Sequence, residues 1–132
     1  MKFQPDTLAG VNVITRHEAG KIWVGALPFE HSLIVPWVGP VLPWQAANFQ
    51  ALTPAHFEQI AALQPEVVIF GSGARLRFPA PALLRALIEK GIGVETMDTA
   101  AASRTYNVLV NEKRSVLGAF IVEVGPPAPQ TL

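Results

Sequence analysis

The second half of the chain alternates between short apolar runs and stretches in which apolar residues recur every three or four positions. Residues 67–70 are Val-Val-Ile-Phe, a β-branched and aromatic run typical of a strand covered on both faces. The longer periodic stretches are typical of helices. The pattern predicts strands at 67–70, 92–97 and 116–124, a helix at 81–90, and a helix that begins at Asp98 or Thr99. This order predicts parallel neighbouring strands joined by right-handed crossovers.

Each of these two helices is expected to bury one face. In the first helix, which Gly91 caps, the inward residues are expected to be Leu83, Leu84, Leu87 and Ile88. In the second helix, the apolar face is predicted to be Ala101, Thr105, Val108 and Leu109. The opposite face of that helix would carry Arg104, Asn107 and Asn111, which are spaced three and four apart.

The first half of the chain predicts three strands joined by turns, at 11–15, 21–24 and 27–35. Their short connections favour antiparallel pairing, and the proline-rich piece at 36–43 is expected to be irregular. Thr53-Pro54 predicts a helix start, because the hydroxyl can cap and proline suits the first helical position. The helix is expected to stop at Pro65, and its apolar face is predicted to be Phe57, Ile60, Ala61 and Leu63.

Together these elements predict one α/β domain at 11–124, with a mixed sheet. The sheet would have a parallel β-α-β-α-β core and antiparallel amino-terminal strands. Residues 1–10 are expected to be an irregular lead-in. Residues 125–132 are rich in proline, which lacks the backbone donor that a central strand needs, so they are expected to be a flexible tail. A chain of 132 residues is long enough to bury the core of one domain.

Composition narrows the classes of function. Hydrophobic residues make up 50% of the chain and charged residues 15%, which is unlike a disordered segment. Ten basic side chains balance ten acidic ones, and without clusters of lysine and arginine we expect no nucleic-acid partner. The absence of cysteine removes disulfides, thiolate metal ligands and a cysteine nucleophile. It fits a reducing compartment, and the expected location is the cytoplasm.

One stretch has the length of a membrane span. Residues 31–57 contain no Asp, Glu, Lys or Arg, and a span needs about 20 apolar residues. However, Pro36, Pro40, Pro43 and Pro54 interrupt this stretch, and polar residues dilute it. We therefore expect a protein that is not integral to a membrane. The start of the chain also lacks the apolar core of a signal peptide.

Small and polar residues follow two of the predicted parallel strands. In open α/β sheets, ligands collect at the carboxyl ends of the strands, where loops and helix amino termini expose backbone donors. Here those ends carry Gly71-Ser72-Gly73, then Arg75, and the helix start at Thr99. The glycines allow close approach of the backbone, and an arginine suits an anion. A dinucleotide fingerprint is incomplete, because Leu76 stands at the position of its third glycine.

The candidate ligand-binding residues are therefore Gly71, Ser72, Gly73, Arg75, Thr99, Arg104 and Asn107. The arginines have two interpretations. Arg75 and Arg77 would share one face of an extended segment, where they could clamp an anion or lie solvated while their stems cover apolar surface. Arg104 and Asn107 could line the ligand pocket or tie down a neighbouring loop.

Neither a catalytic set nor a metal site is indicated. His17, His31 and His56 lie on three different predicted elements without the spacing of metal ligands. Ser72 and Ser103 have no base near them in the sequence, and a nucleophilic serine needs a base within hydrogen-bond reach. We expect no metal and no cofactor. Enzymatic activity stays open, although the pattern favours a protein without it.

Several aromatic residues gather around the prolines of the first half of the chain. If exposed, they would form an apolar patch suited to a protein partner. The alternative is packing under irregular loops, which is the preferred interpretation for Trp23 and Trp44. Trp37 lies between Pro36 and Gly39 and is the candidate partner-binding residue.

Two segments resemble a known family. Residues 71–79 (Gly-Ser-Gly-Ala-Arg-Leu-Arg-Phe-Pro) and 95–107 (Glu-Thr-Met-Asp-Thr-Ala-Ala-Ala-Ser-Arg-Thr-Tyr-Asn) are similar to those of the Mth938-domain family of unknown function. That family includes the mitochondrial complex I assembly factor 3 and the adipogenesis-associated Mth938-domain protein. The resemblance covers the chain from about Asn12 to Val124. It implies a single-domain, three-layer β/β/α fold without an assigned enzymatic activity.

The resemblance also carries expectations about function. In the mitochondrial relative, the role is to assist assembly of a membrane respiratory complex through protein partners. Many relatives carry cysteine where this chain has Ser103, so we expect no thiol-based function at that position.

Two functions from different classes follow. The preferred one is a non-enzymatic protein-interaction or assembly-assisting module that binds a protein partner or a second copy of itself. Its link to a membrane complex rests on the resemblance alone. The alternative is a small-molecule or anion-binding protein, or an enzyme, that uses the strand-end cleft near Gly71-Ser72-Gly73 and Arg104.

Overall fold

The computed structural model places strand β6 (Val67–Gly71) inside a sheet of five strands, in the order β5-β4-β8-β6-β7. All residues of β6 are buried, as its continuous apolar run predicts. It pairs in parallel with both β7 (Gly93–Met97) and β8 (Val116–Phe120). On the other side of β8, strands β4 (Leu33–Pro36) and β5 (Leu42–Pro43) add in antiparallel fashion. The mixed sheet with a parallel core is confirmed.

A second, antiparallel sheet contains β1 (Ile14–Glu18), β2 (Lys21–Val24) and β3 (Leu27–Phe29). The prediction of one strand over 27–35 is wrong, because β3 and β4 belong to different sheets. The chain turns a corner at residues 30–32, where Glu-His-Ser interrupts the apolar run. Ser32 is buried at this corner, and its Oγ accepts a hydrogen bond from the Val122 N–H at 3.0 Å.

Helix α1 (Pro54–Ala61) begins directly after Thr53, as predicted. The Thr53 N–H donates to His56 Nδ1 at 2.9 Å, which holds the first turn. Leu63 lies beyond the end of the helix and is 45% exposed, so its predicted place on the buried face is wrong. The residues that α1 buries are Phe57, Ile60 and Ala61.

The predicted helix at 81–90 forms in two parts. A 3-10 helix, η3 (Pro81–Leu84), leads into the short helix α2 (Arg85–Glu89). Leu87 is buried as predicted, whereas Ile88 is 59% exposed instead of facing inward. The 3-10 turn is wound more tightly than an α-helix and shifts the face that the following residues present.

Helix α3 (Thr99–Asn111) begins at the cap residue Asp98, whose Oδ1 accepts a hydrogen bond from the Ala101 N–H at 2.8 Å. The face of α3 that was predicted to be buried is not the face that the structure buries, since Val108 is 54% exposed. The helix turns polar side chains inward, where other segments satisfy their hydrogen bonds. Its buried residues are Thr99, Ala102, Ser103, Tyr106 and Val110.

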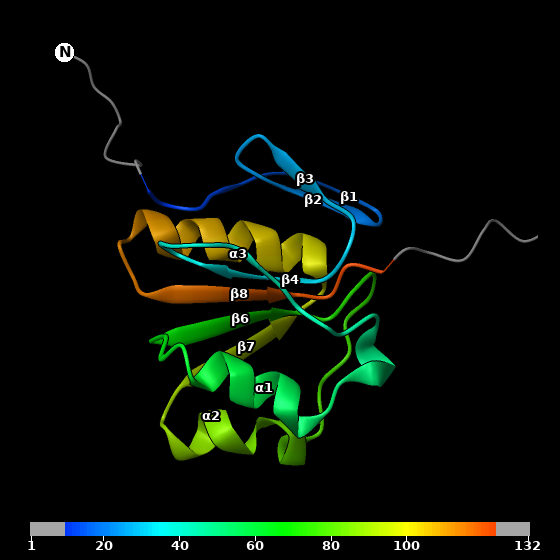
Figure 1. The fold of residues 1–132 in the computed structure, drawn as a ribbon, viewed down its shortest axis with the longest axis vertical. Helices are drawn as coiled ribbons and strands as arrows, with labels where there is room; N and C mark the ends of the chain where they lie inside the picture. The colour runs from blue at the N-terminus through cyan, green and yellow to red at the C-terminus, as the bar shows by residue number, and fades with distance from the viewer. Residues whose placement is uncertain (1–9, 124–132) are drawn as a thin grey trace, which may run out of the picture.

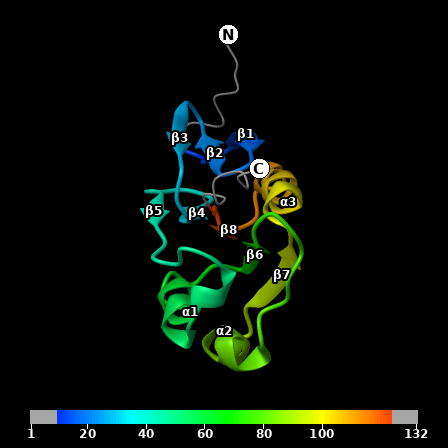
Figure 2. The same ribbon diagram turned by 90° about the vertical axis from the view of Figure 1, so that its right-hand side faces the viewer.

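The elements stack in three layers (Figure 1). Helices α1 and α2 cover one face of the five-stranded sheet, and both views place α3 together with the small sheet on the other face (Figure 2). The first interface packs Phe57 and Leu87 against Phe70, and the second packs Ile22 and Tyr106 with Phe120. The three layers expected of a β/β/α fold are therefore present. In this chain α3 lies in the outer layer together with the small sheet.

The structure describes residues 10–123. Apart from residue 10, the predicted lead-in at 1–10 and the tail at 125–132 lie outside the described residues, as does residue 124 of the predicted last strand. Within the described range, none of the helices has the length and apolar character needed to cross a bilayer.

Candidate functional site

The loop after β6 is held by internal hydrogen bonds. Ser72 is fully buried, its Oγ accepts a hydrogen bond from the Arg77 N–H at 3.0 Å, and the same Oγ lies 2.8 Å from the carbonyl oxygen of Arg75. Gly73 follows with a φ of +109°, a conformation that residues with a side chain rarely adopt. The hydroxyl of Ser72 thus fixes the turn from inside.

Thr99 joins this loop to α3 and to the segment after β8. Its Oγ1 accepts a hydrogen bond from the Gly73 N–H at 2.9 Å and donates to the Ile121 carbonyl oxygen at 2.8 Å. The Thr99 N–H in turn donates to the Gly73 carbonyl oxygen at 2.9 Å. Gly71 leaves room for this contact, because a Cβ there would lie 2.9 Å from Thr99 Oγ1. These N–H groups are therefore used within the fold and are not free to bind an anion.

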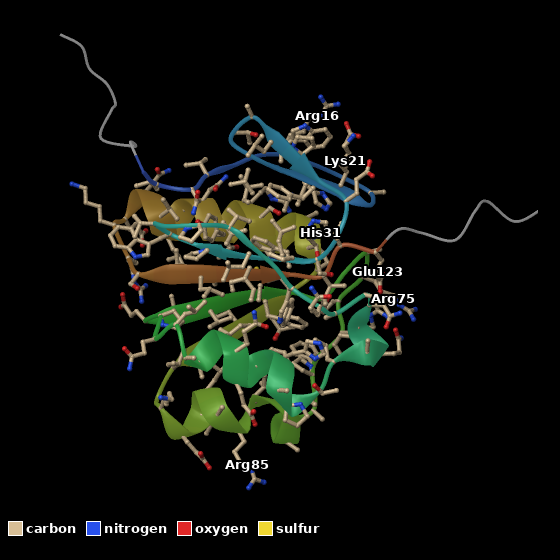
Figure 3. All side chains as sticks on the ribbon, viewed as in Figure 1. Arg16, Lys21, His31, Arg75, Arg85 and Glu123 are labelled. Carbon is tan, nitrogen blue, oxygen red and sulfur yellow. The ribbon has the colours of Figure 1, made fainter. Side chains whose placement is uncertain are left out.

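Arg75 and Arg77 lie in different environments. Arg75 is exposed and projects from the surface (Figure 3). Arg77 is half-buried, with Nη2 3.2 Å from Glu123 Oε2 and 3.3 Å from the Ser72 carbonyl oxygen. Its guanidinium also lies 5.1 Å from the centre of the Phe49 ring. Arg77 therefore anchors its segment, whereas Arg75 is solvated.

Two large apolar side chains on the same segment face solvent. Leu76 is 51% exposed and Phe78 is 70% exposed. The residues that alternate with them are held in place, since Arg77 binds Glu123 and Pro79 is buried. We call Leu76 and Phe78 the apolar ridge. Among residues 10–123, it is the one pair of exposed large apolar side chains that a single residue separates in the sequence.

A hollow of about 400 Å³ lies between β1 and α3. It is lined by Ile14, Thr15, Arg16, His17, Ala100, Ser103, Arg104 and Asn107. Asn107 also ties the two elements together: its Oδ1 accepts a hydrogen bond from the Ile14 N–H at 2.9 Å, and its Nδ2 donates to the Ile14 carbonyl oxygen at 2.7 Å. The sequence left open whether Asn107 lines a pocket or ties down a neighbouring segment. In the structure it does both, since it lines the hollow and holds β1.

His17 faces this hollow and was not among the predicted site residues. It is half-buried and also lines a second, largely apolar hollow of about 220 Å³ next to Gly73. Burial lowers the pKa of His17 below its ordinary value, Asp98 acts to raise it, and Arg104 acts to lower it. The imidazole is therefore predominantly neutral at pH 7. Strand alternation could have found it, because His17 pairs with the fully buried Ile22 and shares its face.

The predicted site residues lie in four different settings. Gly73 and Thr99 line the apolar hollow, while Arg104 and Asn107 line the hollow beside it. Gly71 and Ser72 are packed inside the fold, and Arg75 is exposed.

Two further predictions concern Trp37 and metal binding. Trp37 is half-buried, packs against the core beneath α3, and donates its backbone N–H to the Val116 carbonyl oxygen at 3.0 Å. Its ring is thus less available to a partner than the apolar ridge is. Among residues 10–123, no group of three or more His, Cys, Asp or Glu side chains is placed to hold a metal ion.

Comparison with known proteins identifies a family and several relatives of this chain. Residues 14–121 match the family described as "Protein of unknown function (DUF498/DUF598)". The chain is 36% identical over 94 residues to the Bos taurus protein named NADH dehydrogenase (ubiquinone) 1 alpha subcomplex assembly factor 3. That match covers 70% of this chain and 50% of the relative. The chain therefore spans about half the length of the curated assembly factors that it matches.

Solved structures share the whole fold. A crystal structure of a Bordetella parapertussis protein superimposes with a TM-score of 0.82 at 36% identity, covering 86% of this chain and 98% of that one. A solution structure of a Bordetella pertussis protein, described as a Mth938-like domain, gives a TM-score of 0.80 at 31% identity and covers 93% of each chain. The layers described above are thus those of the Mth938-like fold.

Proposed function

This chain belongs to the DUF498/DUF598 family and has the Mth938-like fold, and from that premise we propose that it is a non-enzymatic module that assists the assembly of a protein complex. It acts by binding a subunit of that complex in the cytoplasm. The observation that carries the proposal is the apolar ridge, in which Leu76 and Phe78 face solvent on a segment that Arg77 holds in place.

The ridge has the properties of a binding anchor. Aromatic residues dominate the energetics of protein interfaces, and burying a side chain such as Phe78 contributes roughly 1.5–3 kcal/mol. Because the Arg77–Glu123 ion pair already holds the segment, little conformational freedom is lost on binding. The exposed Arg75 beside the ridge adds a residue type that is enriched at interfaces.

The state of the two serines supports a role without catalysis. The Ser103 hydroxyl donates to the Thr99 carbonyl oxygen at 2.9 Å, and the Ser72 hydroxyl is buried among backbone groups of its own turn. A serine nucleophile needs a base at its hydroxyl, and both hydroxyls are engaged with the backbone instead.

The names of the relatives indicate which kind of protein the partner would be. Curated relatives from several vertebrates carry the name of an NADH dehydrogenase assembly factor. We therefore propose that the partner is a subunit of the respiratory NADH dehydrogenase, met by this chain before the complex is complete.

Site-specific photo-crosslinking tests the proposal. A photoreactive phenylalanine analogue replaces Phe78 in cells of the source organism, and the matched control carries the same analogue at Val108, an exposed apolar position on α3. We expect crosslinks from position 78 to one NADH dehydrogenase subunit and none to that subunit from position 108. Equal crosslinking from both positions, or no crosslink to a subunit from position 78, would contradict the proposal.

A further inference from the structure

Two side chains that line the hollow between β1 and α3 have no hydrogen-bond partner in the part of the chain that the structure describes. The other polar side chains around it are engaged: Arg16 with Glu18, Thr15 with Gly25, Ser103 with Thr99, and Asn107 with Ile14. Within residues 10–123, His17 and Arg104 make no side-chain hydrogen bond and no ion pair, although both line the hollow. The imidazole and the guanidinium thus remain available to a ligand.

The second hollow adjoins the first at His17, which lines both. Its walls are largely apolar and include Ala19, Ala74, Ile121 and Val122. Its one carboxylate, Glu123, is already paired with Arg77. Because His17 lines both hollows, a polar binding position and an apolar one adjoin at this residue.

The charges nearby limit the ligand to one negative charge. Arg104 offers a planar pair of N–H donors that suits a carboxylate, and a neutral imidazole adds one N–H donor. Asp98 and Glu18 both act electrostatically on His17. Glu18 is paired with Arg16, so the negative charge of Asp98 is the one that disfavours a doubly charged anion such as a phosphate monoester.

We propose that His17 and Arg104 bind the head of a small amphipathic carboxylate, whose short apolar tail lies against Ala74 and Ile121 in the second hollow. This inference does not rest on the proposed assembly function. The ligand site lies between β1, α3 and the loop at Gly73 and Ala74, whereas the partner surface consists of the exposed side chains of Leu76 and Phe78.

Calorimetric titration of the purified full chain with acetate, butyrate and hexanoate tests the site, with hexanol as the uncharged control. Each added methylene is expected to tighten binding about fourfold while it enters the apolar hollow. Hexanol is expected to bind at least tenfold more weakly than hexanoate, because it lacks the charge that Arg104 recognises. No saturable binding of hexanoate, or equal binding of hexanol, would overturn the proposal.

Substitutions test where the carboxylate and the tail of the ligand bind. Arg104→Gln is expected to weaken hexanoate binding about 10- to 100-fold, whereas Arg85→Gln is expected to leave it unchanged. Arg85 projects from α2 at the opposite end of the molecule from Arg16, which lines the hollow (Figure 3). Full affinity in Arg104→Gln, or an equal loss in Arg85→Gln, would show that Arg104 does not bind the carboxylate.

Ala74→Leu tests the tail position. Ala74 is exposed at the rim of the apolar hollow, so a larger side chain is tolerated by the fold. The substitution is expected to reduce hexanoate affinity to that of acetate without changing acetate binding. An unchanged dependence on chain length in this variant would contradict the assignment of the tail. Neither experiment measures the binding of a protein partner, so either proposal can fail without the other.

Discussion

The side chain of Asn107 pairs with the backbone of Ile14 as a neighbouring strand would. Its Oδ1 accepts the Ile14 N–H at 2.9 Å and its Nδ2 donates to the Ile14 carbonyl oxygen at 2.7 Å, across 93 positions of the chain. Strand β1 is an edge strand of the small sheet, and this pair of bonds fastens that edge to α3.

Loss of this pair of bonds is expected to destabilise the fold. Asn107→Ala leaves two half-buried backbone groups without a partner, at a cost of about 1–3 kcal/mol each, and alanine's better helix propensity returns up to about 0.7 kcal/mol. We expect a net loss of about 2 kcal/mol in the free energy of unfolding, measured by urea denaturation. Val108→Ala, one position along α3 and exposed, is the control. A change within 0.5 kcal/mol of that control would refute the fastening role of Asn107.

Position 71 requires glycine because a side chain would not fit there, and not because of its backbone angles. A Cβ at this position would lie 2.9 Å from Thr99 Oγ1 and 3.1 Å from the Phe120 ring, whereas a Cβ at Gly93 would meet nothing within 4 Å. Gly71→Ala is therefore expected to cost about 1–3 kcal/mol, and Gly93→Ala is expected to be neutral or slightly stabilising. Urea denaturation of both variants decides the point, and equal stabilities would disprove the close packing described for Gly71.

The Thr99 hydroxyl is expected to contribute more to stability than its methyl group. Thr99→Val removes the partner of the Gly73 N–H and of the Ile121 carbonyl oxygen, which we expect to cost about 2–3 kcal/mol. Thr99→Ser keeps the hydroxyl and loses one methyl group, at about 1 kcal/mol. Thermal and urea unfolding give the order wild type, serine, valine. If the valine variant were the more stable of the two, the bridging role of the hydroxyl would be wrong.

His17 is expected to make stability fall at acidic pH. Burial lowers its pKa below the ordinary value of 6.5, so the unfolded chain takes up the proton first. Stability is therefore unaffected well above pH 6.5 and declines as the pH falls through 6.5 toward the folded pKa. His17→Gln is expected to lose less stability than wild type between pH 8 and pH 5. An NMR titration midpoint for His17 at or above 6.5 would contradict this assignment.

The same titration tests the charges around His17. Arg104 acts to lower the pKa of His17, so Arg104→Gln is expected to raise the NMR midpoint. Arg85→Gln, on the other side of the sheet, serves as the control and is expected to leave the midpoint unchanged.

Local signals in the sequence were sufficient for much of the fold. The run at β6 predicted a strand buried on both faces, Thr53-Pro54 predicted the start of α1, and Asp98 was one of two predicted caps for α3. Each of these signals is contained in a few neighbouring residues. The corner between β3 and β4 was missed because apolar residues continue on both sides of it, although they belong to different sheets.

The buried face of α3 could not be predicted in the same way. Hydropathy places Ser103 and Asn107 outward, but the Thr99 carbonyl oxygen and the Ile14 backbone satisfy them on the inner side. Those partners are contributed by the fold and not by the helix sequence alone. His17 differs, because the alternation of β1 places it on the face of the buried Ile22 and could have pointed to it. Its neighbours around the two hollows come from α3 and the glycine loop, which the strand sequence does not show.

The proposed assembly role is tested most directly in cells that lack this chain. The gene is deleted in the source organism, and the fraction of fully assembled NADH dehydrogenase is measured by native gel electrophoresis after complementation. We expect wild type and Val108→Ser to restore assembly, and the double variant Leu76→Ser/Phe78→Ser to fail although it accumulates to the same level. Full restoration by the double variant, or unchanged assembly in the deletion strain, would contradict the account.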